Sequence, residues 1–179
     1  MSSSAPKPGH IFWLMGLSGA GKSTLASQLV AALRSQGLPV LPLDGDALRA
    51  GVCQGLGFTA ADRAENLRRA ACIARMARDA GICTVASFIT PLESHRQLIR
   101  EVAGAEGFSL VYMDAPYDVC RQRDVKGLYA RAAAGKVANF TGLSDGFEAP
   151  TQVDLLLHTG AETATASAAR LVEFARSKV

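Results

Sequence analysis

Cysteine and histidine are scarce in this 179-residue chain, and neither has the spacing of a metal site or a disulfide framework. The four cysteines form no Cys-x-x-Cys pair, and the three histidines are scattered along the chain. This pattern excludes a zinc module and a small secreted domain held together by disulfides. We therefore expect reduced thiols, mostly filling the core of a cytoplasmic protein.

Long apolar runs are also lacking, as is a strong charge of either sign. A membrane span needs roughly 20 consecutive apolar residues, whereas the longest runs here, at 11–15 and 82–89, have the length of strands. The first residues, MSSSAPKPGH, have neither the basic start nor the apolar stretch of a signal peptide. The net charge of +3 is too small to indicate nucleic-acid binding. We expect neither a membrane nor a nucleic acid as a partner.

The length allows one compact domain, since domains typically hold roughly 100 to 200 residues. Hydrophobic residues make up 49% of the chain and charged residues 20%, which is typical of a protein with a sizeable core. Residues 1–10 are rich in serine and proline and are expected to form a flexible tail. The sequence therefore predicts a single domain over residues 11–179.

Strand-sized and helix-sized patterns alternate along that domain. Strands with apolar residues on both faces are predicted at 11–15, 38–43, 82–89, 108–113 and 153–158. Helices are predicted at 22–36, at 62–80, from 91 to beyond 102, and at the end of the chain up to 179. For the second helix, Asp62 is the expected N-cap, Glu65 completes the capping pattern and Gly81 ends it. This alternation indicates an α/β fold in which helices cover both faces of a parallel sheet.

The segment GLSGAGKS at 16–23 matches the phosphate-binding pattern GxxxxGK[ST] and stands between a predicted strand and a predicted helix. Its glycines allow backbone N–H groups to face an anion, and the helix N-terminus adds partial positive charge. Lys22 would neutralise the β- and γ-phosphate oxygens, and Ser23 would offer its hydroxyl to Mg²⁺. The alternative is a chance match in a glycine-containing turn, but strand, motif and helix agree in order and length. The motif thus predicts a P-loop NTPase-type fold that binds a nucleoside triphosphate.

Two aspartates follow the second predicted strand. Asp44 and Asp46 flank Gly45, and in extended backbone alternate side chains point the same way, toward the crevice at the strand's carboxyl end. Phosphoryl transfer depends mostly on positioning and charge neutralisation. One carboxylate near the attacking hydroxyl and one near hydrated Mg²⁺ would therefore suffice. The alternative, two aspartates in an ordinary turn, remains open.

Arginines with the reach to bind an anion come next. Arg63 and Asn66 are three residues apart and share a helix face, and Arg49 precedes them. A guanidinium suits a substrate that bears phosphate or sulfate. The alternative is a solvated helix face. The arginines that we assign to such a face are Arg68, Arg75 and Arg78.

With these motifs, the chain resembles the adenylylsulfate kinases. These enzymes use ATP to phosphorylate the 3′-hydroxyl of adenosine 5′-phosphosulfate (APS), which gives 3′-phosphoadenosine 5′-phosphosulfate (PAPS) and ADP in sulfate activation. The resemblance extends from about residue 11 to residue 150. It rests on GLSGAGKST (16–24), LDGD (43–46), LGF (56–58), DRAENLRR (62–69), SFITP (87–91), CRQRDVKGLY (120–129) and FTG (140–142). A P-loop alone names only a superfamily, whereas these ordered segments are specific.

The resemblance implies a role for each matching residue. Asp46 would orient or deprotonate the 3′-hydroxyl of APS, while Asp44 would help Ser23 to hold Mg²⁺ through a water molecule. Phe58 and Phe140 would sandwich the adenine of APS, although both would otherwise be ordinary core candidates. The other residues expected at the APS pocket, or on a mobile lid at about 121–148, are Arg49, Arg63, Asn66, Ser87, Phe88, Ile89, Lys126 and Leu128.

For ATP, the resemblance implies binding by the P-loop together with one or both arginines of the CRQRDVKGLY segment. Arg121 and Arg123 could stabilise the charge that is transferred or stack on the ATP base, and the sequence does not separate these roles. The residues expected to hold the nucleotide are Gly16, Ser18, Gly19, Ala20, Gly21, Lys22, Ser23, Thr24, Arg121 and Arg123.

The resemblance further implies a homodimer and functional coupling to a sulfate adenylyltransferase. Two other functions remain open: a P-loop kinase for another small hydroxyl substrate, such as a sugar acid or nucleotide, and a non-catalytic nucleotide-binding module that signals to a partner. The chain departs from the family pattern at Ala47, where asparagine usually follows LDGD, and at 144–147. These departures bear on substrate fidelity more than on reaction type.

Overall fold

The computed structural model describes residues 8–124, 127, 129–130 and 146–179. Most of the predicted lid, including Lys126, Leu128 and Phe140, lies outside the described residues. Within the described part, no helix is both long and apolar enough to cross a membrane. All four cysteines carry free thiols, and three of them are buried.

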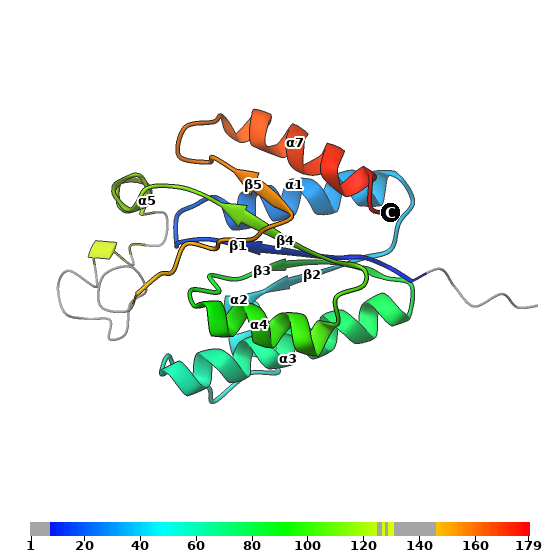
Figure 1. Cartoon of the computed structure of the whole chain (residues 1–179), viewed down its shortest axis with the longest axis horizontal. Helices are drawn as coiled ribbons and strands as arrows, with labels where there is room; N and C mark the ends of the chain where they lie inside the picture. Colours follow the sequence, from blue (N-terminus) through cyan, green and yellow to red (C-terminus); the bar gives the residue numbers. More distant parts are fainter. Residues whose placement is uncertain (1–7, 125–126, 128, 131–145) are drawn as a thin grey trace, which may run out of the picture.

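A five-stranded parallel sheet forms the middle layer, in the order β2-β3-β1-β4-β5 (Figure 1). Its strands are β1 (Ile11–Met15), β2 (Val40–Asp44), β3 (Cys83–Ser87), β4 (Phe108–Met113) and β5 (Leu155–Leu157). The predicted α/β architecture is confirmed. The strands predicted at 82–89 and 153–158 are shorter than expected, because residues at both of their ends lie in the adjoining loops.

Helices cover both faces of the sheet, with α1 and α7 on one side and α3 and α4 on the other (Figure 1). The helices are α1 (Lys22–Ser35), α2 (Gly45–Ala50), α3 (Ala60–Asp79), α4 (Glu93–Ala103), α5 (Tyr117–Arg123) and α7 (Ala164–Arg176). The central strand β1 is fully buried. Phe12 and Leu14 pack into the core beneath α1 and α7, whereas Ile11, Trp13 and Met15 pack beneath α3 and α4. This alternation is the two-residue period of a strand that is covered on both faces.

The predicted N-cap of α3 is wrong. The helix begins two residues before Asp62, and its N-cap is Thr59, whose Oγ1 accepts a hydrogen bond from Asp62 N at 3.2 Å. The Thr59 hydroxyl in turn donates to Asp62 Oδ2 at 2.8 Å. Asp62 is therefore the third helical residue of α3, the position that we had given to Glu65.

Helix α4 also differs from its prediction. Pro91 was expected in its first turn, but α4 begins at Glu93, and Leu92 is the N-cap. Leu92 provides no side-chain hydrogen bond to the helix N-terminus. The short helices α2 and α5 were not predicted, because six or seven residues are too few to show an apolar period.

At the amino edge of the sheet, residues before Ile11 also pack against the domain. Gly9 N donates to Arg78 O at 2.8 Å, and His10 is only 9% exposed. Gly9 and His10 therefore contact the domain, although both fall in the range 1–10 that was assigned to a tail. Arg78 was expected on a solvated face, but its side chain is 13% exposed and donates to Ala103 O at 2.8 Å and to Glu106 O at 2.6 Å.

Candidate functional site

A cavity of about 490 Å³ opens at the carboxyl edge of the sheet. Its wall comes from the loops that follow β1, β2, β3 and β5, together with residues of α3. Carboxyl ends of parallel strands form such a crevice because the connecting loops separate there. The volume lies in the range of small-ligand sites, about 300 to 1,000 Å³. We take this cavity as the candidate active site.

The P-loop forms an anion cradle at one end of the cavity. The N-cap of α1, Gly21, has a φ of 94° and no side-chain hydrogen bond, and no acidic residue lies in the first turn. The first N–H groups of α1 are therefore not capped by a side chain and line the cavity. Gly16 and Gly19 are required where the loop passes other backbone, since an added Cβ would lie 2.6 Å from Met113 O and 2.7 Å from Cys120 O. This geometry is that of a phosphate site.

Two side chains brace the P-loop. Lys22 Nζ donates to Gly16 O at 2.9 Å and to Leu17 O at 2.7 Å, so its ammonium group lies against the loop. Tyr129, which is buried, donates its hydroxyl to Ser18 O at 2.8 Å. Burial raises the pKa of Tyr129, which keeps it a neutral donor. The sequence analysis did not single out Tyr129 as a brace.

Asp44 and Asp46 both line the cavity, but not in the way that strand geometry predicted. β2 ends at Asp44, which becomes the N-cap of α2 and accepts hydrogen bonds at Oδ1 from Asp46 N at 2.9 Å and Ala47 N at 3.3 Å. Asp46 lies in the first helical turn, so the extended two-residue period is wrong here. A strand-to-helix turn carries both carboxylates.

The donor set of the cavity fits Mg²⁺. Ser23 provides a hydroxyl and Asp44 a carboxylate, and both are hard oxygen donors in the same lining. In the part of the chain that the structure describes, no cluster of three or more His, Cys, Asp or Glu could hold a metal alone. Mg²⁺ is commonly held by one or two protein oxygens together with substrate phosphates and water. Ser23 and Asp44 match that arrangement.

At the other end of the cavity, an aromatic ring lies close to two arginines. Phe58 is 52% exposed, and the Arg49 and Arg63 Cζ atoms lie 4.6 Å and 5.6 Å from its ring centroid. Arg49 Nη1 also donates to Gly57 O at 2.6 Å, and Arg63 Nε donates to Phe58 O at 3.0 Å. An exposed ring is not a core residue, so that alternative is excluded for Phe58. A stacking surface beside two guanidiniums suits a base that is linked to an anion.

Two buried polar atoms near this end have no hydrogen-bond partner. Asn66 Oδ1 and Ser87 Oγ belong to residues that are buried and that line the cavity. Buried polar groups are nearly always paired, so these two atoms are candidates for a hydrogen bond that a ligand or a water molecule completes. Phe88 and Ile89 continue the same wall, and the Phe88 ring stacks on Trp13 with centroids 4.9 Å apart.

The structure separates the two arginines that the sequence left together. Arg123 lines the cavity, and its Nη2 donates to Thr159 O at 2.8 Å while its Nη1 donates to Gly19 O at 3.4 Å. Arg121 is not part of the lining. Its side chain is 60% exposed and forms an ion pair with Asp118 at 3.4 Å. Only Arg123 is brought to the nucleotide end.

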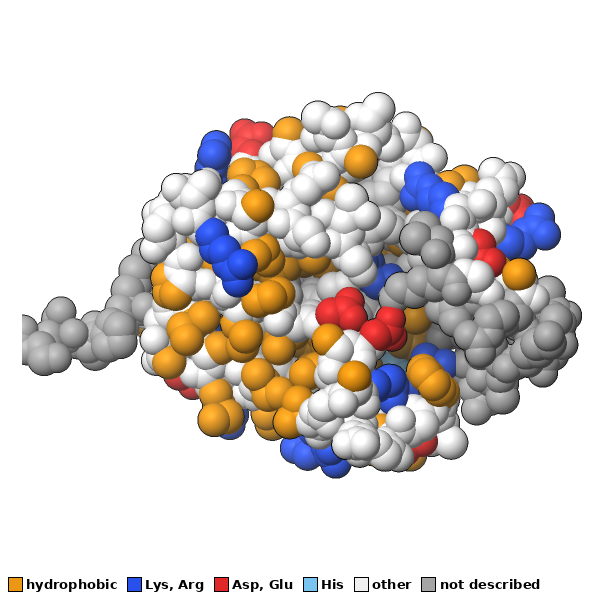
Figure 2. Space-filling model, turned by 180° about the vertical axis from the view of Figure 1, so that it is seen from behind, with side chains coloured by type: hydrophobic (Ala, Val, Ile, Leu, Met, Phe, Trp, Pro, Cys, Tyr) orange, Lys and Arg blue, Asp and Glu red, His pale blue; other side chains and the backbone are white. Residues whose placement is uncertain are grey.

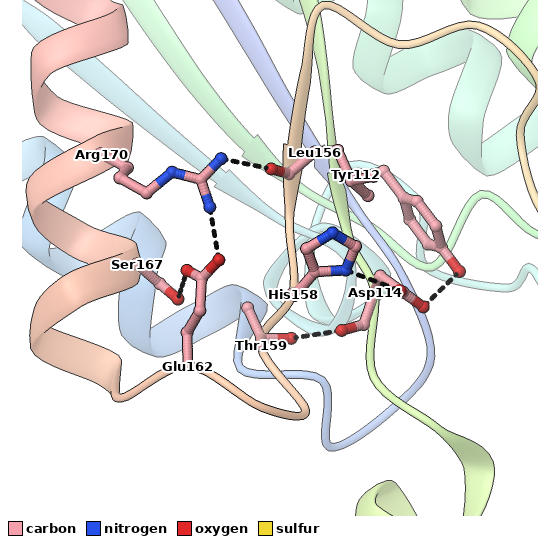
Figure 3. A network of polar contacts seen from close by, with 8 residues as sticks. All are labelled: Tyr112, Asp114, Leu156, His158, Thr159, Glu162, Ser167 and Arg170. Carbon is pink, nitrogen blue, oxygen red and sulfur yellow. Dashed lines mark hydrogen bonds and ion pairs between the residues drawn. The ribbon is translucent and has the colours of Figure 1, made fainter.

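The loop between β5 and α7 contributes wall residues that the sequence analysis missed. A polar network holds this loop against the end of β4 (Figure 3). Asp114 accepts at Oδ1 from the Tyr112 hydroxyl at 3.4 Å, pairs through Oδ2 with His158 Nδ1 at 3.1 Å, and accepts at its carbonyl from Thr159 Oγ1 at 3.3 Å. Burial, reinforced by the Asp114 carboxylate, raises the pKa of Tyr112 to about 12. The network fixes Thr159 beside the cavity.

Glu162 follows in the same loop. Its carboxylate accepts from Ser167 Oγ at 2.8 Å and pairs with Arg170, which also donates to Leu156 O at 3.0 Å (Figure 3). The hydrogen bond from Ser167, with support from the Arg170 charge, lowers the pKa of Glu162. The position of these residues in the sequence could have revealed them. Residues that follow the last parallel strand reach the same edge of the sheet as the P-loop.

Most predicted residues lie together in the lining of this cavity. Those that line it are Ser18, Gly19, Ala20, Gly21, Lys22, Ser23, Thr24, Asp44, Asp46, Arg49, Phe58, Arg63, Asn66, Ser87, Phe88, Ile89 and Arg123. Gly16 is buried beneath the loop. The lining residues that were not predicted are Leu25, Gly45, Leu67, Thr90, Pro91, Thr159, Glu162, Ala164 and Ser167.

Comparisons with known proteins identify a family for the chain. The family model of adenylylsulphate kinase matches residues 8–158. An adenylyl-sulfate kinase of Paraburkholderia xenovorans is 50% identical over 151 residues, which cover 84% of each chain. The bifunctional enzyme NodQ of Rhizobium tropici is 45% identical over 169 residues, which are 94% of this chain but 27% of that enzyme.

Among solved structures, the Mycobacterium tuberculosis APS kinase in complex with AMPPNP and APS superposes with a TM-score of 0.91. It is 39% identical in sequence, and the alignment covers 96% of this chain and 99% of that one. Family model, sequence relatives and fold therefore agree over nearly the whole chain. The chain belongs to the adenylylsulfate kinase family.

Proposed function

We propose that the protein transfers the γ-phosphoryl group of ATP to the 3′-hydroxyl of APS, giving PAPS and ADP. The observation that carries this proposal is that one cavity joins two unlike ends. An anion cradle at the N-terminus of α1 lies at one end, and an exposed phenylalanine close to two arginines lies at the other. Asp44 and Asp46 belong to the same wall.

The chemistry follows from the charges at the cradle. The α1 N–H groups and Lys22 bind and neutralise the phosphate oxygens, which is most of what phosphoryl transfer requires. Asp46 orients the 3′-hydroxyl and accepts its proton. Ser23 and, through water, Asp44 would hold Mg²⁺, which when bound neutralises charge on the transferred group.

Each nucleotide has its own end of the cavity. The base of ATP lies beside Arg123 and the loop of Thr159, since these meet at the P-loop rim. The adenine of APS stacks on Phe58, and Arg49 and Arg63 bind its phosphosulfate. Asn66 Oδ1 and Ser87 Oγ gain partners from the same substrate. Lys126, Leu128 and Phe140 retain the roles that the resemblance implies.

The test is product formation by the purified protein with Mg-ATP and APS, followed by chromatography of the nucleotides. We expect PAPS and ADP in equal amounts, and loss of both with Lys22→Met. A panel of sugar acids and other nucleotides tests the alternative of another hydroxyl substrate. ATP binding without any turnover would instead favour the non-catalytic module.

We also propose that the protein acts in the cytoplasm as a homodimer. One face carries many hydrophobic side chains (Figure 2), and the large exposed hydrophobics of the described surface include Val52 and Met76. On this basis, light scattering should give twice the mass of 18.8 kDa. A monomer at micromolar concentration would overturn the dimer.

Functional coupling to a sulfate adenylyltransferase is a separate proposal. It is supported by the relative NodQ, a bifunctional enzyme of which this chain matches 27%. Such coupling predicts that PAPS forms from sulfate and ATP when the two proteins are mixed. The rate of PAPS formation in this mixture is compared with the rate when the same concentration of APS is added directly. Equal rates would overturn the coupling, since the two enzymes would then share only the free metabolite.

A further inference from the structure

An arginine is buried in the first turn of α4, behind the wall of the cavity. Arg96 is 2% exposed, and its Nε donates to Glu93 Oε2 at 2.7 Å. Its Nη1 donates to Glu148 O at 3.0 Å and approaches the carbonyl oxygens of Thr90 and Pro91, each at 3.4 Å. A buried guanidinium is retained only where such partners compensate its desolvation. The partners here all belong to one turn and one distant segment.

The N-cap residue of α4, Leu92, makes no side-chain hydrogen bond to the helix, and Glu148 from the distant segment takes this role. Glu148, 55 residues after Glu93, accepts at Oε2 from Glu93 N at 2.6 Å, and this carboxylate oxygen lies 3.9 Å from Arg96 Nη2. Glu148 N also donates to Pro91 O at 2.9 Å. A carboxylate at a helix N-terminus satisfies its N–H groups and interacts favourably with the helix dipole. Arg96 and Glu148 together therefore bind the turn from both sides.

The turn that they hold is strained. Thr90 is β-branched, yet its φ of 47° lies in the left-handed region that favours glycine. Two contacts hold Thr90, one at its side chain and one at its backbone: Trp13 Nε1 donates to Thr90 Oγ1 at 2.9 Å, and Arg96 Nη1 approaches Thr90 O. Strain of this kind persists only where the surroundings fix it, and it is concentrated at functional sites.

The strained turn is part of the proposed APS end of the cavity. Residues 87–91 line it continuously, and they include Ser87, whose hydroxyl is unpartnered. The P-loop touches this turn through Gly16 N, which donates to Ile89 O at 3.3 Å. The P-loop is braced separately, however, by Lys22 and Tyr129. Loosening the turn should therefore affect the APS end and leave the ATP end in place.

We propose that Arg96 and Glu148 are a positioning pair that holds residues 87–91 in the shape that receives APS, and so sets the affinity for the acceptor but not for ATP. The proposal rests on the function proposed above. Neither residue lines the cavity. Their effect is exerted through the carbonyl oxygens and the helix N-terminus that they bind.

The first experiment is steady-state kinetics of Arg96→Met, Arg96→Lys and Glu148→Gln. Because hydrogen bonds to charged groups are among the stronger ones, we expect Arg96→Met to raise KM for APS about tenfold while KM for ATP changes less than about twofold. Arg96→Lys should recover part of the loss. Glu148→Gln should lose less, since its amide oxygen still accepts from Glu93 N. The control is Arg100→Met, on the same helix and outside the lining.

A second measurement needs no activity. Amide hydrogen exchange of ligand-free protein should accelerate at Glu93 and Glu148 in Arg96→Met, and in Glu148→Ala at Glu93, with the amides of residues 19–24 unchanged. Should Arg96→Met fail to fold, Arg96→Lys and Glu148→Gln carry both measurements. Exchange thus reports on the turn even if APS is not the substrate.

The outcomes separate the possibilities. An equal rise of KM for APS and ATP, unchanged exchange at both reporter amides, or strictly additive effects in the Arg96→Lys/Glu148→Gln double variant would each overturn the pair. If exchange responds but the wild type makes no PAPS, the proposed function fails, and with it the APS role of the pair. If PAPS forms and only KM for APS responds, both proposals stand.

Discussion

The two edges of the sheet differ in how several of their polar groups are paired, although Thr84 Oγ1, near the amino edge, is also buried without a partner. At the amino edge, His10 Nε2 pairs with Ser109 Oγ at 2.9 Å, and Arg78 donates to two carbonyl oxygens, at the end of α4 and in the loop that follows it. At the carboxyl edge, Asn66 Oδ1 and Ser87 Oγ are buried without partners. Paired polar groups stabilise the fold, whereas unpaired ones cost stability until a ligand completes them. The comparison predicts that substitutions at one edge change stability and those at the other change activity.

The largest effect should come from the carboxyl edge. Asp46→Asn removes the proposed proton acceptor but keeps its shape, and general-base catalysis typically contributes about 10²- to 10⁴-fold. We expect kcat for PAPS formation to fall by that factor. Because the Asp46 side chain is exposed, the melting temperature should not change. If Asp46→Asn instead lost stability and kept its kcat, the prediction that the carboxyl edge controls activity would be contradicted.

The amino edge should respond to pH. Burial, helped by the charges of Lys178 and Arg78 and opposed by Asp154, lowers the pKa of His10 to about 4 from 6.5. Between these values the unfolded chain binds more protons than the folded one, so stability falls as pH drops from 6.5 to 4. The integrated loss is on the order of 3 kcal/mol.

Denaturant unfolding across this pH range measures that loss, with His10→Gln as the control. The variant cannot titrate at this position, so its stability should depend less steeply on pH than that of the wild type. If unfolding free energy depends on pH equally steeply in the wild type and in His10→Gln, His10 is not the titrating group, and it does not contribute to the difference between the edges.

A third effect concerns Arg78 and its matched neighbour Arg75. Arg78→Met removes donors to Ala103 O and Glu106 O, and hydrogen bonds to charged groups contribute about 1.5 to 3 kcal/mol. We expect a loss of that size in unfolding free energy with unchanged kcat and KM. Arg75→Met, at an exposed position of the same helix, should change neither. A fall in kcat for Arg78→Met would mean that the two edges are coupled.

Sequence patterns predicted one end of the site better than the other, for a physical reason. The P-loop is contiguous and built from backbone, so GLSGAGKS specifies its own geometry. Thr159 and Glu162 reach the cavity only because a parallel strand delivers them to the same edge. Arg96 and Glu148 meet across 52 residues, and no local pattern encodes that contact. The prediction from local pattern also failed at Asp62. Thr59 and Asp62 are both of residue types that cap helices, and the observed N-cap of α3 is Thr59.

The smallest expected effect, that of Ser87→Ala, is distinctive because stability should improve while APS binding weakens. Ser87→Ala removes a buried hydroxyl that has no partner, and burying such a group costs about 1 to 3 kcal/mol. We expect the unfolding free energy to rise by up to about 1 kcal/mol while KM for APS rises several-fold and KM for ATP stays constant. Thermal denaturation and steady-state kinetics measure the two quantities on one preparation. The control is Ser109→Ala at the amino edge, where the hydroxyl is paired with His10: it should lose stability and leave both KM values unchanged. If Ser87→Ala also loses stability, the hydroxyl has a partner in the free protein, and its contrast with the amino edge disappears.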